Sequence, residues 1–350
     1  MKSKLITISS LVLLALLITS NLLYAGNEDR AGQAGASELL INPWARSTGW
    51  GDANSSCVKG FEAIFSNVAG TAFTKQTDLV YSRSIYLKGT GIFINSGGLS
   101  QKVGETGVLS IALMSMSFGD IDVTTCALPE GGLGTYSPSY FNVALAYAKE
   151  FSNSIYGGIV VKVVNESISD LKATGVCFDA GIQYVTGKRK QIHFGISLKN
   201  MGTTMKFKGD GLSFRSEGTN GVNMTVDSRS ADFELPMMLK IGGAYDLKLQ
   251  ESHALTIAGT FTSNSFTKDQ IHAGLEYSFK NILFLRGGYI YEKGIGSYET
   301  RTTAYTGPTA GLSVQVPINK ENGSSFSIDY SYRSTDPFEG THNIGVKVSL

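Results

Sequence analysis

Residues 173–200 alternate between apolar side chains and small or polar ones, on both sides of a charged turn at residues 187–190. Because successive side chains of a β-strand point to opposite faces, this period of two predicts a hairpin with one apolar face and one polar face. The apolar positions are Val176, Phe178, Ala180, Ile182 and Tyr184 before the turn, and Ile192, Phe194, Ile196 and Leu198 after it.

The polar face of this hairpin is rich in glycine and serine, and the alternation returns along nearly the whole chain. A transmembrane barrel requires such a pattern, with lipid outside, a polar lumen inside and no unpaired sheet edge. A soluble sandwich would instead bury the apolar face in a core. We therefore predict an all-β fold: a transmembrane antiparallel β-barrel of about fourteen strands with an N-terminal, partly helical plug in its lumen.

Candidate strands follow one another from residue 77 onward. They lie at residues 77–86, 88–96, 106–118, 139–149, 154–165, 174–185, 191–200, 233–245, 253–262, 270–279, 282–291, 303–316, 325–333 and 341–350. If the first strand runs outward, the longest connections, 119–138 and 201–232, both lie outside, as is usual in such barrels. Four tyrosines on apolar faces near inner strand ends indicate an interfacial belt: Tyr147, Tyr184, Tyr245 and Tyr277.

The chain divides into three parts. Residues 1–25 read as a signal peptide, with Lys2 and Lys4 before an apolar run and Ala25 at the cleavage site; a transmembrane helix is the alternative. Residues 26–76 do not alternate, and 58–65 carry apolar residues at roughly helical spacing. We predict that this segment plugs the lumen, and the alternative is a small periplasmic appendage. Residues 77–350 form the barrel.

Candidate functional residues fall into two groups. The first, in the plug, could line a pocket for a ligand: Ile64, Phe65, Asn67, Val68 and Phe73. The second comprises charged and histidine side chains on faces predicted to line the lumen: Asp179, His193, Lys240, His272, Glu276, Asp329 and Lys347. We interpret these charges as structural, holding the plug and solvating the interior. The alternative is a cross-lumen ion network of Asp179, Lys240, Glu276, Asp329, Arg333 and Lys347.

Other chemistries lack a sequence signal. No nucleophile, base and orienting group fall together, and no phosphate-binding loop is present, so neither an enzyme nor a cofactor is expected. A net charge of +1 argues against nucleic acid as a partner. The three cysteines show no metal or redox spacing. A disulfide between Cys57 and Cys126 is conceivable in an oxidising compartment.

Several stretches resemble the PorV/PorQ family of outer-membrane proteins, which are relatives of the FadL fatty-acid transporters. The stretches are residues 45–53 (ARSTGWGDA), 66–70 (SNVAG, with Val68 where proline is usual), 177–181 (CFDAG) and 196–207 (ISLKNMGTTMKF). The resemblance implies a fourteen-stranded barrel with an N-terminal plug in the bacterial outer membrane. It also implies a role in type IX protein secretion, through binding of secreted cargo or translocon subunits.

Two functions therefore stand side by side. The first is a protein-binding barrel of the PorV/PorQ type, whose partners would be secretion-system subunits or secreted cargo. The alternative is a FadL-like channel for hydrophobic small molecules, whose ligand would sit between plug and wall. Outer-membrane lipid surrounds the barrel in both.

Overall fold

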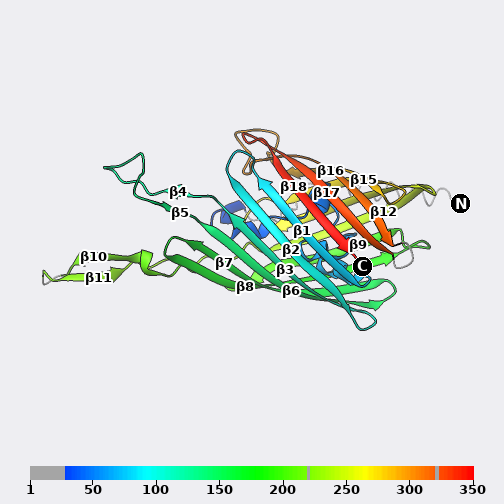
Figure 1. The fold of residues 1–350 in the computed structure, drawn as a ribbon, viewed down its shortest axis with the longest axis horizontal. Helices are drawn as coiled ribbons and strands as arrows, with labels where there is room; N and C mark the ends of the chain where they lie inside the picture. Colours follow the sequence, from blue (N-terminus) through cyan, green and yellow to red (C-terminus); the bar gives the residue numbers. More distant parts are fainter. Residues whose placement is uncertain (1–27, 219–220, 320–322) are drawn as a thin grey trace.

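A computed structural model describes residues 28–218, 221–319 and 323–350. Fourteen antiparallel strands close into a barrel (Figure 1), so the predicted fold class is confirmed. β1 pairs with β18, with Tyr81 opposite Val346, and this pairing closes the sheet. The barrel strands are β1 (Thr77–Tyr86), β2 (Ile92–Val103), β3 (Gly107–Ser117), β6 (Ser139–Ser152), β7 (Ile155–Ile168), β8 (Leu171–Thr186), β9 (Ile192–Gly202), β12 (Met238–Gln250), β13 (His253–Asn264), β14 (Gln270–Phe279), β15 (Leu283–Glu292), β16 (Tyr305–Asn319), β17 (Ser324–Thr335) and β18 (Thr341–Ser349).

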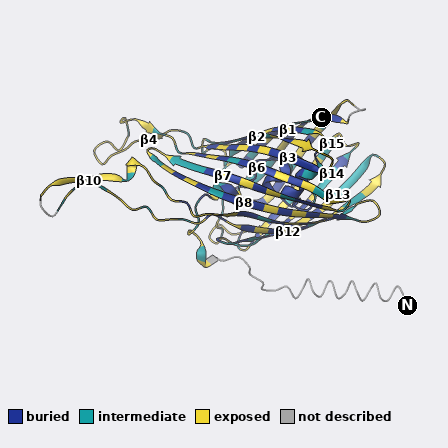
Figure 2. Cartoon of the chain, turned by 90° about the horizontal axis from the view of Figure 1, so that it is seen from below, coloured by how far each residue is buried: buried dark blue, intermediate teal, exposed yellow. Residues whose placement is uncertain are grey.

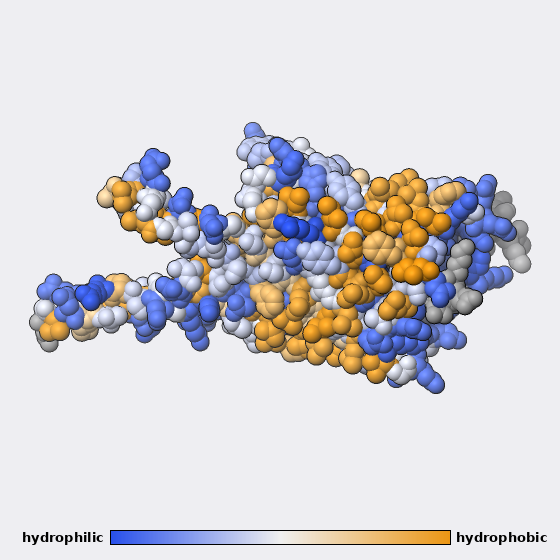
Figure 3. Space-filling model, viewed as in Figure 1, coloured by the Kyte–Doolittle hydropathy of each residue, from blue (hydrophilic) through white to orange (hydrophobic). Residues whose placement is uncertain are grey.

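Burial alternates along the strands, as Figure 2 shows for β6 and β8. On β8, Phe178 and Ile182 are 47% and 57% exposed, whereas Asp179 and Gln183 between them face inward and are buried. The outward side chains form an apolar surface around the barrel wall (Figure 3). An apolar exterior on a closed sheet requires lipid, and the protein is a barrel of the bacterial outer membrane. Among the described helices, none has the length and apolar character needed to cross a bilayer.

The two ends of the barrel differ. Two arms project from one end (Figure 1), which we call the outer end. One arm carries β4 (Ile121–Asp122) and β5 (Thr135–Tyr136); the other carries η5 (Asp210–Leu212), β10 (Ser213–Glu217) and β11 (Asn223–Asp227). The short turns and the last residue of β18 lie at the inner end, which faces the periplasm in barrels of this kind. The sequence predicts both long connections but not the small hairpins inside them.

Most of the residues before β1 lie inside the barrel, where they form η2 (Ser37–Leu40), α2 (Ala45–Thr48), η3 (Phe61–Phe65) and η4 (Val68–Phe73). The preceding η1 (Glu28–Arg30) lies at the outer mouth, where Arg30 pairs with Glu234. At the outer end, Gly35 N donates to Glu234 O at 3.0 Å. At the inner end, Thr74 donates to Asp78 of β1 at 3.2 Å. We call residues 37–74 the lumen segment, because they run from one end of the barrel to the other. The predicted signal peptide lies outside the described residues.

Two predicted strand positions are wrong by several residues. The second strand is expected at 88–96 with a turn at 97–105, but β2 runs from Ile92 to Val103. The β2–β3 turn is confined to residues 104–106, and residues 87–91, where Leu87, Gly89 and Gly91 have positive φ, form the turn between β1 and β2. Gly98 is a strand residue whose missing side chain makes room for Phe61, since a Cβ there would lie 2.6 Å from that ring. A Gly-Gly pair thus marks close packing here, not a turn.

The strand expected at 233–245 is displaced in the same way. β12 begins at Met238, just after Pro236, which has no amide hydrogen to donate to a ladder. It continues to Gln250 through Asp246 and Lys248, which the sequence analysis assigns to a turn. Both residues occupy positions facing the lumen, where charge is tolerated.

The conceivable disulfide between Cys57 and Cys126 does not form, and all three thiols are free. Cys57 lies within the lumen segment, beside a cavity near the inner end. Cys126 is exposed in the arm that carries β4 and β5 at the outer end. The length of the barrel separates the two residues.

Candidate functional site

Polar contacts join the lumen segment to β13, β14 and β17 on one side of the barrel wall, and others join it to β1, β8 and β9. Arg46 donates to Asp329 of β17 at 3.1 Å, and the hydroxyls of Thr48 and Ser331 are 2.7 Å apart. Further contacts join Ser55 to Thr260 at 2.8 Å and His272 Nδ1 to Gly51 O at 2.7 Å. These wall residues belong to β13, β14 and β17. Buried hydrogen bonds of this kind fix the segment in one position.

Most of the buried apolar side chains lie in the opposite half of the lumen, beside a buried ion pair between Lys162 and Asp179. Trp44 packs edge-on against Phe61 and Phe65, with ring centroids 5.1 and 5.8 Å apart. Small and flexible wall residues lie against these rings. We call the whole cluster the apolar seam; its segment members include Leu39, Trp44, Phe61, Ile64, Phe65 and Val68, and its wall members include Ile94, Ala112, Met114, Met116, Tyr140, Ala144, Ala146, Val160, Val164, Cys177, Met205 and Leu235.

The seam is continuous from the outer end toward the inner end. Leu39 and Leu235 lie at the outer mouth, where Asn200 of β9 contacts the carbonyls of Leu39 and Pro236. Val68 lies at the other end of the same cluster, in η4, which packs on β6, β7 and β8. The wall side of the seam comes from lumen-facing positions of β2, β3, β6, β7 and β8. One side of the lumen therefore carries a continuous cluster of apolar side chains, with the Lys162–Asp179 ion pair set into its wall.

The five plug residues predicted from sequence are distributed over the seam and its inner edge. Ile64, Phe65 and Val68 are buried members of the seam. Asn67 is also buried, but it acts through polar contacts: it caps η4 by accepting from Ala69 N at 3.2 Å and donates to Ile182 O of β8 at 3.1 Å. Phe73 lies apart from them and stacks on Tyr156 at 4.1 Å.

The predicted lumen-facing polar residues all lie on the inside of the barrel, but they form separate local pairs. Asp179 pairs with Lys162, Asp329 with Arg46, and Lys347 with Asp78. Glu276 and Arg286 are 2.5 Å apart, and His193 lies 2.9 Å from Asp246. His272 bonds to Thr262 and Gly51, and Lys240 is buried beside the lumen segment.

Sequence reasoning misses three residues that organise this site. Trp44 and Phe61 are fully buried in the seam, and Arg46 is the cation that joins the segment to β17. One feature of the sequence could have identified them. All three lie in a stretch without alternation, where a large aromatic or charged side chain can be buried only if another part of the chain packs against it or pairs with it. Arg46 also lies 3.9 Å from Glu62. Burial raises the pKa of Glu62, against the opposing effect of Arg46.

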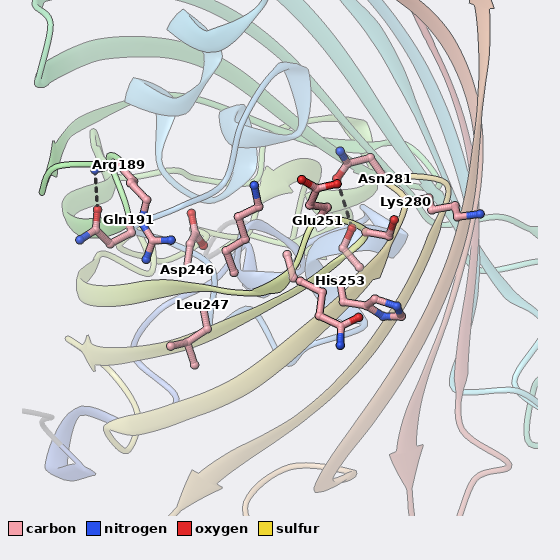
Figure 4. Close-up of a pocket in the computed structure, with 13 residues that line it drawn as sticks. Arg189, Gln191, Asp246, Leu247, Glu251, His253, Lys280 and Asn281 are labelled. Carbon is pink, nitrogen blue, oxygen red and sulfur yellow. Dashed lines mark hydrogen bonds between the residues drawn. The ribbon is translucent and has the colours of Figure 1, made fainter.

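Cavities lie at the inner end, on the polar side. One of about 330 Å³ is lined by residues of the 187–191, 246–254 and 278–281 regions (Figure 4). A second of about 290 Å³ adjoins it, sharing Asp246 and Ala254, and reaches Arg46 and Glu62 of the lumen segment. In the described part of the chain, no three metal-ligating side chains come together.

No protein-family model and no curated protein matches this sequence. Solved structures do match in fold. The toluene transporter TodX of Pseudomonas putida gives a TM-score of 0.56 at 11% identity, over 88% of this chain and 97% of that one. The toluene transporter TbuX of Ralstonia pickettii gives 0.54 at 11% identity, over 88% and 98%. A FadL homologue of Pseudomonas aeruginosa gives 0.51 at 11% identity, over 88% and 97%. The fold is thus that of FadL-like barrels.

Proposed function

We propose that this barrel conducts small hydrophobic molecules across the outer membrane along the apolar seam. The observation that carries the proposal is the apolar seam, one cluster of buried apolar side chains that continues along one side of the lumen segment. The proteins that share the fold include two toluene transporters, which supports this reading over protein secretion.

The side chains of the seam are suited to a transport path that opens when a hydrophobic molecule enters it. Met114 and Met116 are flexible side chains that can rearrange around an apolar molecule. The wall presents only small side chains where the segment packs against it, at Ala112, Ala144 and Ala146. The hydrogen bonds on the opposite side keep the segment from leaving the lumen. A small displacement of the segment toward its polar anchor would open space along the seam, and the lumen segment would otherwise close the pore.

An uptake assay with a matched pair of variants tests the proposal. Ala144→Phe fills the seam, whereas Ala273→Phe adds the same side chain on the exposed outer face of β14. Cells producing each barrel are given radiolabelled toluene and a radiolabelled long-chain fatty acid. We expect Ala144→Phe to lower uptake to the level of cells without the barrel, with Ala273→Phe at the parent level. Equal uptake by both variants would show that the seam is not the path.

A second candidate is binding of secreted proteins or secretion-system subunits, the role that the PorV/PorQ resemblance implies. The arms at the outer end favour it, because Phe214, Val222 and Met224 on one and Leu128 and Leu133 on the other are about half exposed, at 48–60%. Apolar side chains on projecting hairpins are typical of surfaces that bind other proteins. Deleting residues 213–227 should then remove partners that copurify with the intact barrel while leaving hydrocarbon uptake unchanged.

A further inference from the structure

Exposed cations are found at both ends of the barrel, some in ion pairs and some without one among the described residues. At the outer end, Arg30 pairs with Glu234 at 2.6 Å, Lys88 with Glu339 at 2.8 Å and Arg301 with Asp336 at 2.7 Å. At the inner end, a group of exposed cations forms no ion pair within the described residues: Lys188, Arg189, Lys190, Lys248 and Lys280. We call these five residues the inner cation cluster.

Three of the five residues of the cluster line the cavity of about 330 Å³ at the inner mouth. Arg189 of the β8–β9 turn, Lys248 near the end of β12 and Lys280 of the β14–β15 turn line this cavity, and Figure 4 shows the Lys280 side chain at its rim, directed away from the other lining residues. The carboxylate of Asp246 also lines it, but its oxygens already accept from Thr256 at 2.7 Å and contact His193 at 2.9 Å. Glu251 is the other carboxylate in the lining, so cations exceed available anions.

The cavity opens toward the periplasm and the lumen. Asp246, Lys248 and Ala254 occupy the lumen-facing register of β12 and β13, the same register as buried Ala244 and Ala258. The adjoining cavity continues from there to Lys59 and Arg46 of the lumen segment. A phospholipid headgroup outside the wall would meet the opposite face of these strands, where Leu249 and Ile257 are exposed.

We propose that the inner mouth docks an acidic segment of a periplasmic protein, whose carboxylates pair with Arg189 and Lys248 in the cavity and with Lys280 at its rim. Complementary charge steers such a partner to the mouth and sets its register. A segment seated in this cavity extends toward Lys59, so the partner contacts the barrel and the lumen segment together. The proposal is independent of what the seam conducts.

A peptide-binding assay tests the proposal. The purified full-length barrel in nanodiscs of neutral lipid is titrated against a fluorescein-labelled, glutamate-rich peptide, and the affinity is compared with that of a glutamine-rich peptide. The test variant is Arg189→Glu/Lys248→Glu/Lys280→Glu. The control, Lys75→Glu/Lys102→Glu/Lys149→Glu, reverses three exposed inner-end cations that also form no ion pair among the described residues. We expect salt-sensitive binding of the acidic peptide, weakened at least about tenfold by the test variant and little by the control.

Three results would overturn the proposal: no preference for the acidic peptide, equal weakening by both triple variants, or peptide binding unaffected by the test variant. A lipid role is distinguished in nanodiscs containing phosphatidylglycerol. If the test variant loses enrichment of that lipid while the acidic peptide never binds, the cluster serves the membrane and the proposal fails. Heat-modifiable gel migration verifies assembly, and the corresponding triple glutamine variant replaces any glutamate variant that does not assemble.

Discussion

The guanidinium of Arg46 lies 3.1 Å from the carboxylate of Asp329, although 283 positions separate the two residues in the sequence. Asp329 is buried on β17, and Arg46 stands in α2 of the lumen segment. Ser327 donates to the second carboxylate oxygen at 3.3 Å, so both oxygens have partners. This pair is the charged anchor on the polar side of the lumen, opposite the apolar seam.

Removing one member of this pair should loosen the lumen segment. Asp329→Ala removes the nearest counter-charge of Arg46 and leaves Glu62, 3.9 Å away, as the remaining one; breaking a buried ion pair costs up to about 3–5 kcal/mol. We expect the variant to show frequent channel openings in planar bilayers, where the parent stays closed. The double variant Arg46→Met/Asp329→Leu removes both charges and should recover most of the closure. Openings as frequent in the double variant as in the single one would contradict the anchor role.

Deleting residues 26–76 while keeping the signal peptide should leave a barrel that conducts ions continuously. A barrel of this size is too wide for its own side chains to fill, since about eight strands is the width at which they do. The lumen segment supplies the missing filling. Planar-bilayer recordings of the deletion variant and the parent provide the measurement. A deletion variant as closed as its parent would show that something else obstructs the lumen.

Neighbouring glycines of β15 provide a matched test of packing between segment and wall. A Cβ at Gly288 would lie 2.4 Å from the backbone of Trp50, whereas one at Gly287 would meet nothing within 4 Å. Gly288→Val should therefore force the segment away from the wall, at a cost of about 1–3 kcal/mol, and lower the unfolding temperature. Gly287→Val should leave the temperature unchanged or slightly raised. The same loss at both positions would point to strand propensity as its cause.

Two adjacent residues of β13 test which face meets lipid. Ile257 is 46% exposed on the outer face, and Thr256 lines the cavity of about 290 Å³ near the inner end. Arginine at Ile257 should impair membrane assembly, because a charge on the lipid face costs up to about 2–4 kcal/mol. An arginine at Thr256 would extend into the cavity and not into lipid, so we expect this variant to assemble nearly as well as the parent. Heat-modifiable gel migration measures assembly. Equal impairment would mean that both faces are packed against protein.

The orientation predicts which parts of the chain are accessible from outside. An epitope in the arm between β10 and β11 should be labelled on intact cells, because projecting loops tolerate insertions. The same epitope at the β2–β3 turn, residues 104–106, should be labelled only after the outer membrane is permeabilised. The reverse pattern would show that the barrel is inserted the other way round.

The sequence by itself determined the faces of the strands and the number of strands. Phe178 and Asp179 could be assigned to opposite sides because the period of two is a local property of the backbone. The ends of the strands were harder to predict, because glycine occurs both in turns and where a strand packs closely against a neighbour. Gly98 was expected in a turn, but it is a strand residue that makes room for Phe61.

Only the tertiary structure decided how the lumen is divided. Arg46 carries no local sign that its partner is Asp329, and nothing around Trp44 in the sequence indicates that β2, β3 and β6 to β8 supply an apolar wall. These relationships arise when the sheet closes, because closure brings strands from distant parts of the chain around one segment. Alternation fixes which side chains point inward, but the stagger of the closed barrel determines which of them meet.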